Sequence, residues 1–362
     1  MTALADASAV RPERILLIVV IAAIGAVLPL SAAISELRHP RDAAPLSIDS
    51  NYIRDDRFFA SSFESRVEAA VGAAPRQPGT SAVRFHDPEV IETVAGNLTI
   101  ERDRVPASIT DVHGDLLVRS GTLLVKEALT GGSATIEKDS SLRAIKSRTD
   151  IILGTNVRVE RWVDAGRTIF ASAHADLGVR ATAQHSIVLE PGVVFRFVSA
   201  PMISVGTPAD TSTGAVEAPG AVADLAGNRR HRIRADGALI VDEAFLIPPG
   251  SSSKGDFIAR GDVVIGDGAT VIGSIHCDRD VKVGAGANVT GSVVAERNVT
   301  IDRGGVVDGH VVAHGRASLA NGARVGKPGC VTTLLADEGV EMAGGSAVYG
   351  RIITYAVGRS VA

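Results

Sequence analysis

The same short pattern returns at a fixed interval over much of the second half of the chain. The segment "VVIGDG" at Val263 returns as "VKVGAG" at Val281 and as "VTIDRG" at Val299, which is an 18-residue period. Self-similarity at a short fixed period indicates a repeat architecture, in which each unit packs mainly on its neighbours. At or near this spacing, twelve candidate units begin at Leu98, Leu116, Ala134, Ile151, Ile169, Ile187, Phe245, Val263, Val281, Val299, Ala317 and Val340.

The sixth residue of each unit supports this alignment, because it is always Gly, Asn, Asp or His. These residue types tolerate a positive φ with the least strain. The pattern therefore predicts a corner with a left-handed residue in every turn. In the first half the corner residues are Asp103, Gly121, Asp139, Asn156, His174 and Gly192, and in the second half they are Gly250, Gly268, Gly286, Gly304, Gly322 and Gly345.

In the best units, pairs of small or apolar residues, two apart, recur three times. A spacing of two places both side chains on one face of a strand, and three pairs per unit indicate three short strands per turn. We therefore predict an all-β fold, a three-sided parallel β-solenoid with an 18-residue turn. The predicted core columns include Val263, Ile265, Val271, Ile275, Val281, Val283, Val289, Val293, Val299 and Ile301.

Composition agrees with a thin core. The chain of 362 residues is 45% hydrophobic but only 4% aromatic, and it holds 38 Gly. A narrow prism leaves little room for rings, whereas a large globular core normally uses them. At about 4.8 Å per turn, twelve turns would give a rod on the order of 60 Å.

Residues 15–34, "ILLIVVIAAIGAVLPLSAAI", form an uncharged apolar run. At about 1.5 Å per residue a helix of this length spans roughly 30 Å, the thickness of a bilayer core. We expect a retained single-pass transmembrane anchor. A cleaved signal peptide is the alternative, because Ser31, Ala32 and Ala33 are small enough for a peptidase site. Arginines on both sides leave the orientation undecided.

The predicted organisation has six parts. Residues 1–14 flank the anchor at 15–34, and residues 35–96 hold a linker and a short helix near 55–71, with Phe59, Phe63, Val67 and Val71 on one face. A worn first half of the solenoid covers 97–204. Residues 205–232, rich in Ala, Gly, Pro and Thr, form a loop or a joint, and 233–362 form the regular second half.

The segments "GDVVIGDGATVIGSI", "DVKVGAGANVTGSV" and "NVTIDRGGVVDGHVV" resemble the repeats of bactofilins, bacterial polymer-forming cytoskeletal proteins. The likeness is good from about Phe245 to Ile353 and weaker from Leu98 to Phe197. The resemblance implies a right-handed β-helix that assembles end to end without nucleotide, with its body on the cytoplasmic face of the membrane. This chain is longer than small bactofilins, and it adds an anchor and a worn first half.

Polymerisation also has a physical basis. The last strand of a solenoid has unpaired backbone groups, which a cap covers or a second copy pairs with. No amphipathic capping helix follows the last unit, so we expect the C-terminal end to dock on another copy. The candidate assembly end is Val348, Ile352 and Ile353. The alternative is a strand or tail that folds over this end.

No enzyme class fits the sequence well. His276, His310 and His314 occupy different positions of the turn, so we expect no metal site and no cofactor. A hexapeptide-repeat acyltransferase would need an aliphatic-Gly pair every six residues, yet Ile265-Gly266 and Ile272-Gly273 are seven apart. A polysaccharide-cleaving β-helix would need aromatic platforms, and the chain has one Trp and three Tyr.

The partners expected from the sequence are other copies of the chain and the inner membrane, with envelope or cell-shape proteins as further candidates. The net charge of −4 and the pI near 6.2 argue against nucleic acid. The sequence thus predicts a membrane-anchored structural protein that is not an enzyme. A periplasmic scaffold for envelope proteins is the alternative.

Overall fold

The computed structural model describes residues 55–72, 80–86, 89–102, 104–207, 231–234 and 238–362. The chain divides into two units, Met1–Asn51 and Tyr52–Ala362. The first unit, with the predicted anchor at 15–34, lies outside the described residues. Among the helices of the described part, none is long and apolar enough to cross a membrane.

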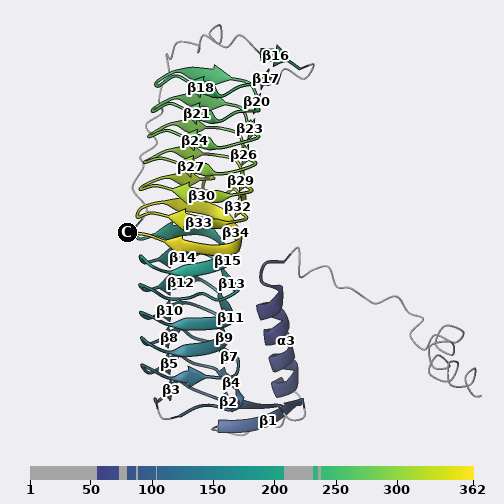
Figure 1. The fold of residues 1–362 in the computed structure, drawn as a ribbon. Helices are drawn as coiled ribbons and strands as arrows, with labels where there is room; N and C mark the ends of the chain where they lie inside the picture. The colour runs from purple at the N-terminus through teal and green to yellow at the C-terminus, as the bar shows by residue number, and fades with distance from the viewer. Residues whose placement is uncertain (1–54, 73–79, 87–88, 103, 208–230, 235–237) are drawn as a thin grey trace, which may run out of the picture. The chain divides into compact units, whose positions relative to one another are not determined.

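The second unit is an all-β parallel solenoid of about 13 turns. It consists of two stacks of strands, one on each side of β34 and β15 (Figure 1). Each turn contributes to three sides, which we call A, B and C.

In the first half, side A holds β3 (Leu98–Ile100), β5 (Leu116–Val118), β8 (Ala134–Ile136), β10 (Ile151–Leu153), β12 (Thr168–Ala171) and β14 (Ser186–Leu189). Side B begins with β6 (Leu123–Leu124). Side C holds β2 (Glu89–Val94), β4 (Ile109–Val112), β7 (Ala128–Thr130) and β13 (Arg180–Ala183). The strands β9 (Ser141–Ser147) and β11 (Arg158–Ala165) continue from side B to side C, and β15 (Val194–Val205) runs along all three sides.

In the second half, side A holds β18 (Phe245–Ile247), β21 (Val263–Ile265), β24 (Val281–Val283), β27 (Val299–Ile301), β30 (Arg316–Leu319) and β33 (Gly339–Met342). Side B holds β19 (Ser252–Lys254), β22 (Thr270–Ile272), β25 (Asn288–Val289), β28 (Val306–Val307) and β31 (Arg324–Val325). Side C holds β17 (Leu239–Val241), β20 (Phe257–Ala259), β23 (Ile275–Cys277), β26 (Val293–Ala295), β29 (Val311–Ala313) and β32 (Thr332–Ala336). The last strand, β34 (Ala347–Ser360), runs along all three sides.

The 18-residue period is the register of the parallel ladders. Val263 faces Val281 and Val281 faces Val299 on side A, while Ile275 faces Val293 on side C. Within the three-residue strands β21, β24 and β26 the first and third side chains are buried and the middle one is more exposed. This is the alternation of a pleated strand with one face on the core.

One continuous apolar cluster fills both halves, and most of its members are Val, Ile, Leu and Ala. Rings are confined to a few places. Phe195 lies fully buried in β15, and the stacked pair Phe245 and Phe257, with centroids 5.2 Å apart, fills the outermost turns of the second half. The narrow prism thus accounts for the small number of aromatic residues.

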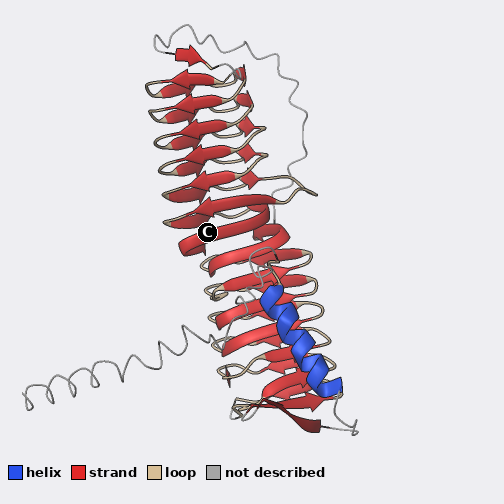
Figure 2. Cartoon of the chain, turned by 90° about the vertical axis from the view of Figure 1, so that its right-hand side faces the viewer, coloured by secondary structure: helices blue, strands red, loops and turns tan. Residues whose placement is uncertain are grey.

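The helix α3 (Phe58–Gly72) lies along side C of the first half (Figure 2). It buries Ala60, Phe63 and Val67. Phe63 and Val67 form a second apolar cluster with Ile91, Ile109 and Leu129, and Trp162 packs against it. Phe59 lies outside this buried face and is 46% exposed.

The two halves run in opposite directions and meet at their C-terminal ends. β15 pairs antiparallel with β34, so Phe197 faces Ile353 where the two C sides meet, and Ile203 faces Val348 where side A of the first half meets side B of the second. Of the segment expected as a loop or joint, 205–232, Val205 hydrogen-bonds across this contact to Ser346 and Gly345, and 208–230 lie outside the described residues.

Candidate functional site: an antiparallel joint and the strap across it

The predicted corner residues lie at turns with a left-handed backbone. The φ angles of Gly268, Gly286 and Gly304 are 67°, 63° and 66°, and those of Gly250, Gly322 and Gly345 are similar. The three described non-glycine residues with positive φ are Asp139, Asn156 and His174, all of which are corners of the first half. Asp103 lies outside the described residues.

The predicted core columns lie inside the prism. All ten residues are at most 1% exposed: Val263, Ile265, Val271, Ile275, Val281, Val283, Val289, Val293, Val299 and Ile301. Cys277 is also buried, and burial raises the pKa of its thiol. Cys330 is a free, exposed cysteine.

The candidate assembly end is covered within the chain. Val348 and Ile352 are fully buried, and Val348, Ile352 and Ile353 face Ile203, Val198 and Phe197 of β15. We expected these residues to meet another copy, but the first half of the same chain occupies the position. A partner strand that lies far earlier in the sequence leaves no periodic signal, which is why the 18-residue repeat did not predict it.

Backbone hydrogen bonds close the joint at both ends of β15. The amide of Gly192 donates to the carbonyl of Ser360 at 2.8 Å, and the amide of Gly345 donates to the carbonyl of Val205 at 2.8 Å. The hydroxyl of Ser360 donates to the carbonyl of Glu190. The backbone N–H and C=O groups of the two edge strands are thereby hydrogen-bonded to each other, as they are between the strands inside each half.

Gly358 allows the halves to approach closely. A Cβ atom added at this position would overlap the Phe195 ring. Phe195 is fully buried and faces Gly358 across the joint. The aromatic ring of one half therefore fills the space that a side chain of the other half would need.

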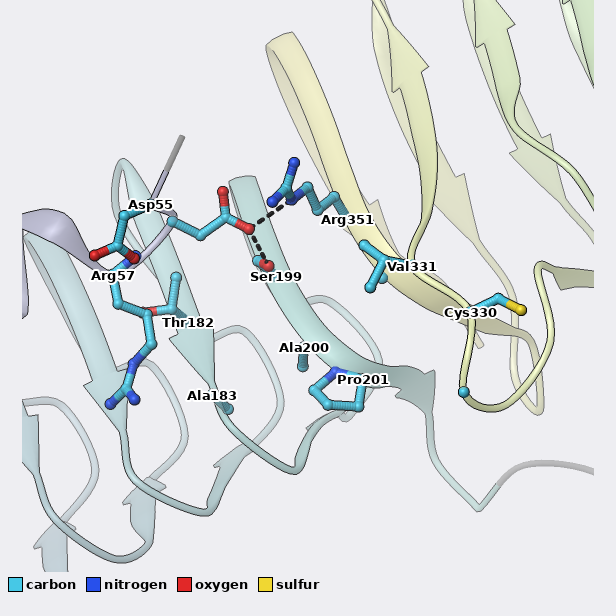
Figure 3. A pocket seen from close by; sticks show the side chains of 13 residues that line it. Asp55, Arg57, Thr182, Ala183, Ser199, Ala200, Pro201, Cys330, Val331 and Arg351 are labelled. Atoms are coloured by element: carbon cyan, nitrogen blue, oxygen red, sulfur yellow. Dashed lines mark hydrogen bonds and ion pairs between the residues drawn. The ribbon is translucent and has the colours of Figure 1, made fainter. Parts of the chain in front are cut away.

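Residues 55–72, which we call the strap, fasten the first half to the joint. The carboxylate of Asp56 accepts hydrogen bonds from Ser199 of β15 and from Arg351 of β34, both at 2.6 Å (Figure 3). One side chain thus touches both halves. Arg180 donates to the Asp56 carbonyl at 2.9 Å, and its guanidinium lies over the rings of Phe197 and Phe59.

A nearly buried charge cluster lies under the strap. Arg57 binds both carboxylate oxygens of Asp164, which is 1% exposed, at 2.7 and 2.6 Å, and this hydrogen bonding raises the pKa of the guanidinium. Thr182 donates to the same carboxylate at 2.6 Å. Bidentate arginine–carboxylate pairs are the strongest of the common ion pairs, and breaking one when it is buried is costly.

Further along α3, acidic side chains meet basic strands. Glu64 contacts Lys146 at 2.7 Å and Arg148 at 2.8 Å, and Arg148 also contacts Glu68. Burial pushes the pKa of Glu64 upward, but hydrogen bonds from Lys146 and Arg148 outweigh it, so the pKa lies below its ordinary value. The strap supplies mainly acids to a surface that supplies mainly bases.

A cavity of about 470 Å³ opens where the strap meets the joint. Pro201 and Val331 line it beside the Asp56–Arg351 pair, and Cys330 lies at its edge (Figure 3). Of the charged groups here, Asp56 pairs with Arg351 and Arg57 pairs with Asp164. Among the described residues no three His, Cys, Asp or Glu side chains gather as a metal site, and His314 instead pairs with Asp337 at 3.0 Å.

The outer ends of the two halves are built alike. An antiparallel strand covers side C at each end: β1 (Thr80–His86) pairs with β2, and β16 (His231–Ile233) pairs with β17. On side A, among the described strands, β3 pairs only with β5 and β18 only with β21. Among the described strands, the edges without a second partner therefore lie at the outer ends on side A and not at the C-terminal strand.

The regular second half carries a family signal. Residues 245–354 match the family model Bactofilin, described as polymer-forming cytoskeletal. We call this matching segment the bactofilin domain. It begins at β18, on the outer edge, and ends inside β34, at the joint. No curated protein and no solved structure matches the chain.

The bactofilin domain covers the part of the chain in which the sequence repeat is most regular. The first half, the strap and the joint lie mostly outside it. Sequence reasoning missed the strap contacts and the joint. One signal was available for the strap: on side C the outward positions of the first half carry Lys146, Asp164 and Thr182, whereas those of the second half carry Val294 and Val312.

Proposed function

We propose that this protein is a structural, polymer-forming component of the cytoskeleton that self-assembles end to end without nucleotide. The bactofilin domain carries this proposal, because it folds as one half of a solenoid whose outermost strand on side A, β18, has one partner among the described strands. Assembly uses backbone pairing and stacking of apolar columns, so it needs no hydrolysis step. The protein performs no catalysis in this proposal.

Negative-stain electron microscopy of the full chain in detergent tests the polymer. We expect unbranched filaments, and we expect the same filaments after apyrase treatment, which removes nucleoside triphosphates. Discrete particles at every concentration would contradict polymerisation. Filaments that disappear after apyrase treatment would contradict assembly without nucleotide.

The proposal includes a membrane tether at residues 15–34. The support is the uncharged apolar run, which has the length of a bilayer-spanning helix. Tethering raises the local concentration of the bodies and favours their assembly on a surface. We place the body on the cytoplasmic side by its bactofilin domain.

A C-terminal reporter fusion tests the side of the membrane. A reporter that is active only in the cytoplasm should be active, and a reporter that needs export should be silent. The reverse pattern would favour a periplasmic scaffold. Carbonate extraction of membranes should leave the full chain in the pellet and release a chain that lacks residues 1–34.

A further inference from the structure

We propose that the chain carries one end-to-end contact inside itself and that copies join through the outer edges of β3 and β18. This inference rests on the proposed polymer-forming function and names the surfaces that the polymer uses. Its partner is a second copy of the chain, which supplies an antiparallel edge strand.

The internal joint is already complete. β15 and β34 meet along all three sides of the prism, and the amides and carbonyls at both ends of β15 are paired. The apolar core continues through it without interruption. A contact of this kind leaves no edge on either strand for another chain.

On its outer edge, β18 pairs with no other strand among the described residues. The amide of Phe245 donates to Asp262 and the carbonyl of Ile247 accepts from Gly266, both at 2.8 Å, so these two residues face β21. Successive residues of a strand point their backbone groups to opposite sides, so the amide and carbonyl of Leu246 point outward. Its side chain is 59% exposed.

The outer edge of β3 repeats this arrangement. The amide of Leu98 donates to Asp115 at 2.9 Å, and the carbonyl of Ile100 accepts from Arg119 at 3.0 Å. The amide and carbonyl of Thr99 therefore point away from β5. Thr99 is exposed, and β3 has no second partner among the described strands.

Strand polarity selects the partner. β3 and β18 both lie at the end where their solenoid half begins, so two such ends can meet only with their strands antiparallel, as at the joint. Two partners could pair with such an edge: the outer end of a second copy, which pairs antiparallel, or a further turn, which pairs parallel. The antiparallel requirement favours the second copy. The repeat along a filament is then one whole body of about 13 turns, roughly 60 Å.

Proline substitution tests the edges directly. Thr99→Pro with Leu246→Pro removes the two outward donors and leaves the amides bonded to β5 and β21 in place. We expect the full chain to fold and its critical concentration for assembly to rise roughly tenfold or more. The matched control is Thr99→Ala with Leu246→Ala, which keeps both amides and should polymerise like the wild type.

A second pair of variants guards against misfolding by proline. Thr99→Lys with Leu246→Lys keeps the whole backbone and places a charge on each edge, which discourages pairing. If the proline and lysine variants fold and still form filaments like those of the wild type, the assignment of the edges is wrong. A wild type that forms no filament at all would instead refute the proposed function.

Crosslinking tests the internal joint. Val194 and Arg359 face each other across it, one on β15 and one on β34. In a Cys330→Ser background, Val194→Cys with Arg359→Cys should oxidise to a crosslinked monomer within filaments, and electron microscopy should show the repeat of roughly 60 Å. Crosslinked dimers would show that the joint forms between chains and would overturn the inference.

Discussion

At the corners of the solenoid, single residues decide whether the backbone turns at low cost. Gly286 has a φ of 63°, and a Cβ atom added there would meet nothing within 4 Å. The position is therefore demanding in conformation but not in space. The first half shows which side chains satisfy it, because Asp139, Asn156 and His174 adopt the same conformation.

A pair of substitutions at Gly286 separates these two demands. Gly286→Ala should lower the free energy of unfolding by about 1 kcal/mol, because alanine is strained at positive φ. Gly286→Asn should cost less than half as much, although its side chain is larger. Thermal melts followed by circular dichroism measure both. An asparagine variant less stable than the alanine variant would contradict the conformational explanation.

The core columns permit a similarly simple test. Val283 is fully buried, and its neighbours in the column are Ile265 and Ile301. Val283→Asp buries an unpaired charge and should cost several kcal/mol, about 3 or more, with loss of the β-sheet signal. The control Lys282→Asp changes the exposed neighbour in the same strand. Equal stability of the two variants would show that the facing is misassigned.

At the scale of elements, the strap differs from the solenoid strands in how it is held. Strands are fixed by ladders and a shared core, whereas α3 combines a small apolar contact with several ion pairs. The acids of the strap meet bases on β9 and β34. Ion pairs of this kind respond to pH and salt, so the strap is the element most easily released.

The pH dependence of strap binding follows from Glu64. Its folded pKa is lowered, so it stabilises the docked strap above the unfolded pKa near 4.5, and that stabilisation is lost as pH falls through the folded value. The protection of the α3 amides against hydrogen exchange should therefore fall below about pH 4.5, before the solenoid unfolds.

Two variants identify the residue responsible. Glu64→Gln should remove most of the loss of protection that depends on the titration of Glu64. It should also lower the protection of the α3 amides at neutral pH. Glu68→Gln changes the more exposed acid of the same helix, which meets only Arg148 among the ion pairs described, and it should change the profile much less. A profile unaffected by Glu64→Gln would assign the acid response to other carboxylates.

At the scale of the whole molecule, the decisive contact is the approach of the two halves. Phe195 fills the space over Gly358, and Asp56 bridges Ser199 and Arg351 where the two C sides meet. The joint thus combines close packing, strand pairing and an ion pair between Asp56 and Arg351. Its stability decides whether the two halves behave as one body.

Gly358→Ala tests this close approach. The added methyl group forces the buried Phe195 ring to move, and overpacking of this kind costs about 1–3 kcal/mol. We expect a lower melting temperature and faster hydrogen exchange in β15 and β34, with the outer turns unchanged. Protection that falls equally in all turns would indicate general destabilisation instead. Phe195→Leu with Gly358→Ala should restore part of the loss.

The repeat in the sequence specified the strands, their registers and the core columns, because each turn packs on the next turn along the chain and leaves the same residue types at the same positions. It also specified the corners, since positive φ restricts the residue type. Contacts between successive turns therefore appear in the sequence as the 18-residue period. Val281, between Val263 and Val299, shows it in one column.

The partner of the last strand and the place of α3 were settled only by the tertiary structure. β34 meets β15 once in the molecule, so this contact repeats nothing and has no period. The backbone groups of β34 could form hydrogen bonds with the edge of many strands, so the sequence of β34 alone does not specify its partner. The first half of the same chain, held beside it by Asp56, supplies that edge.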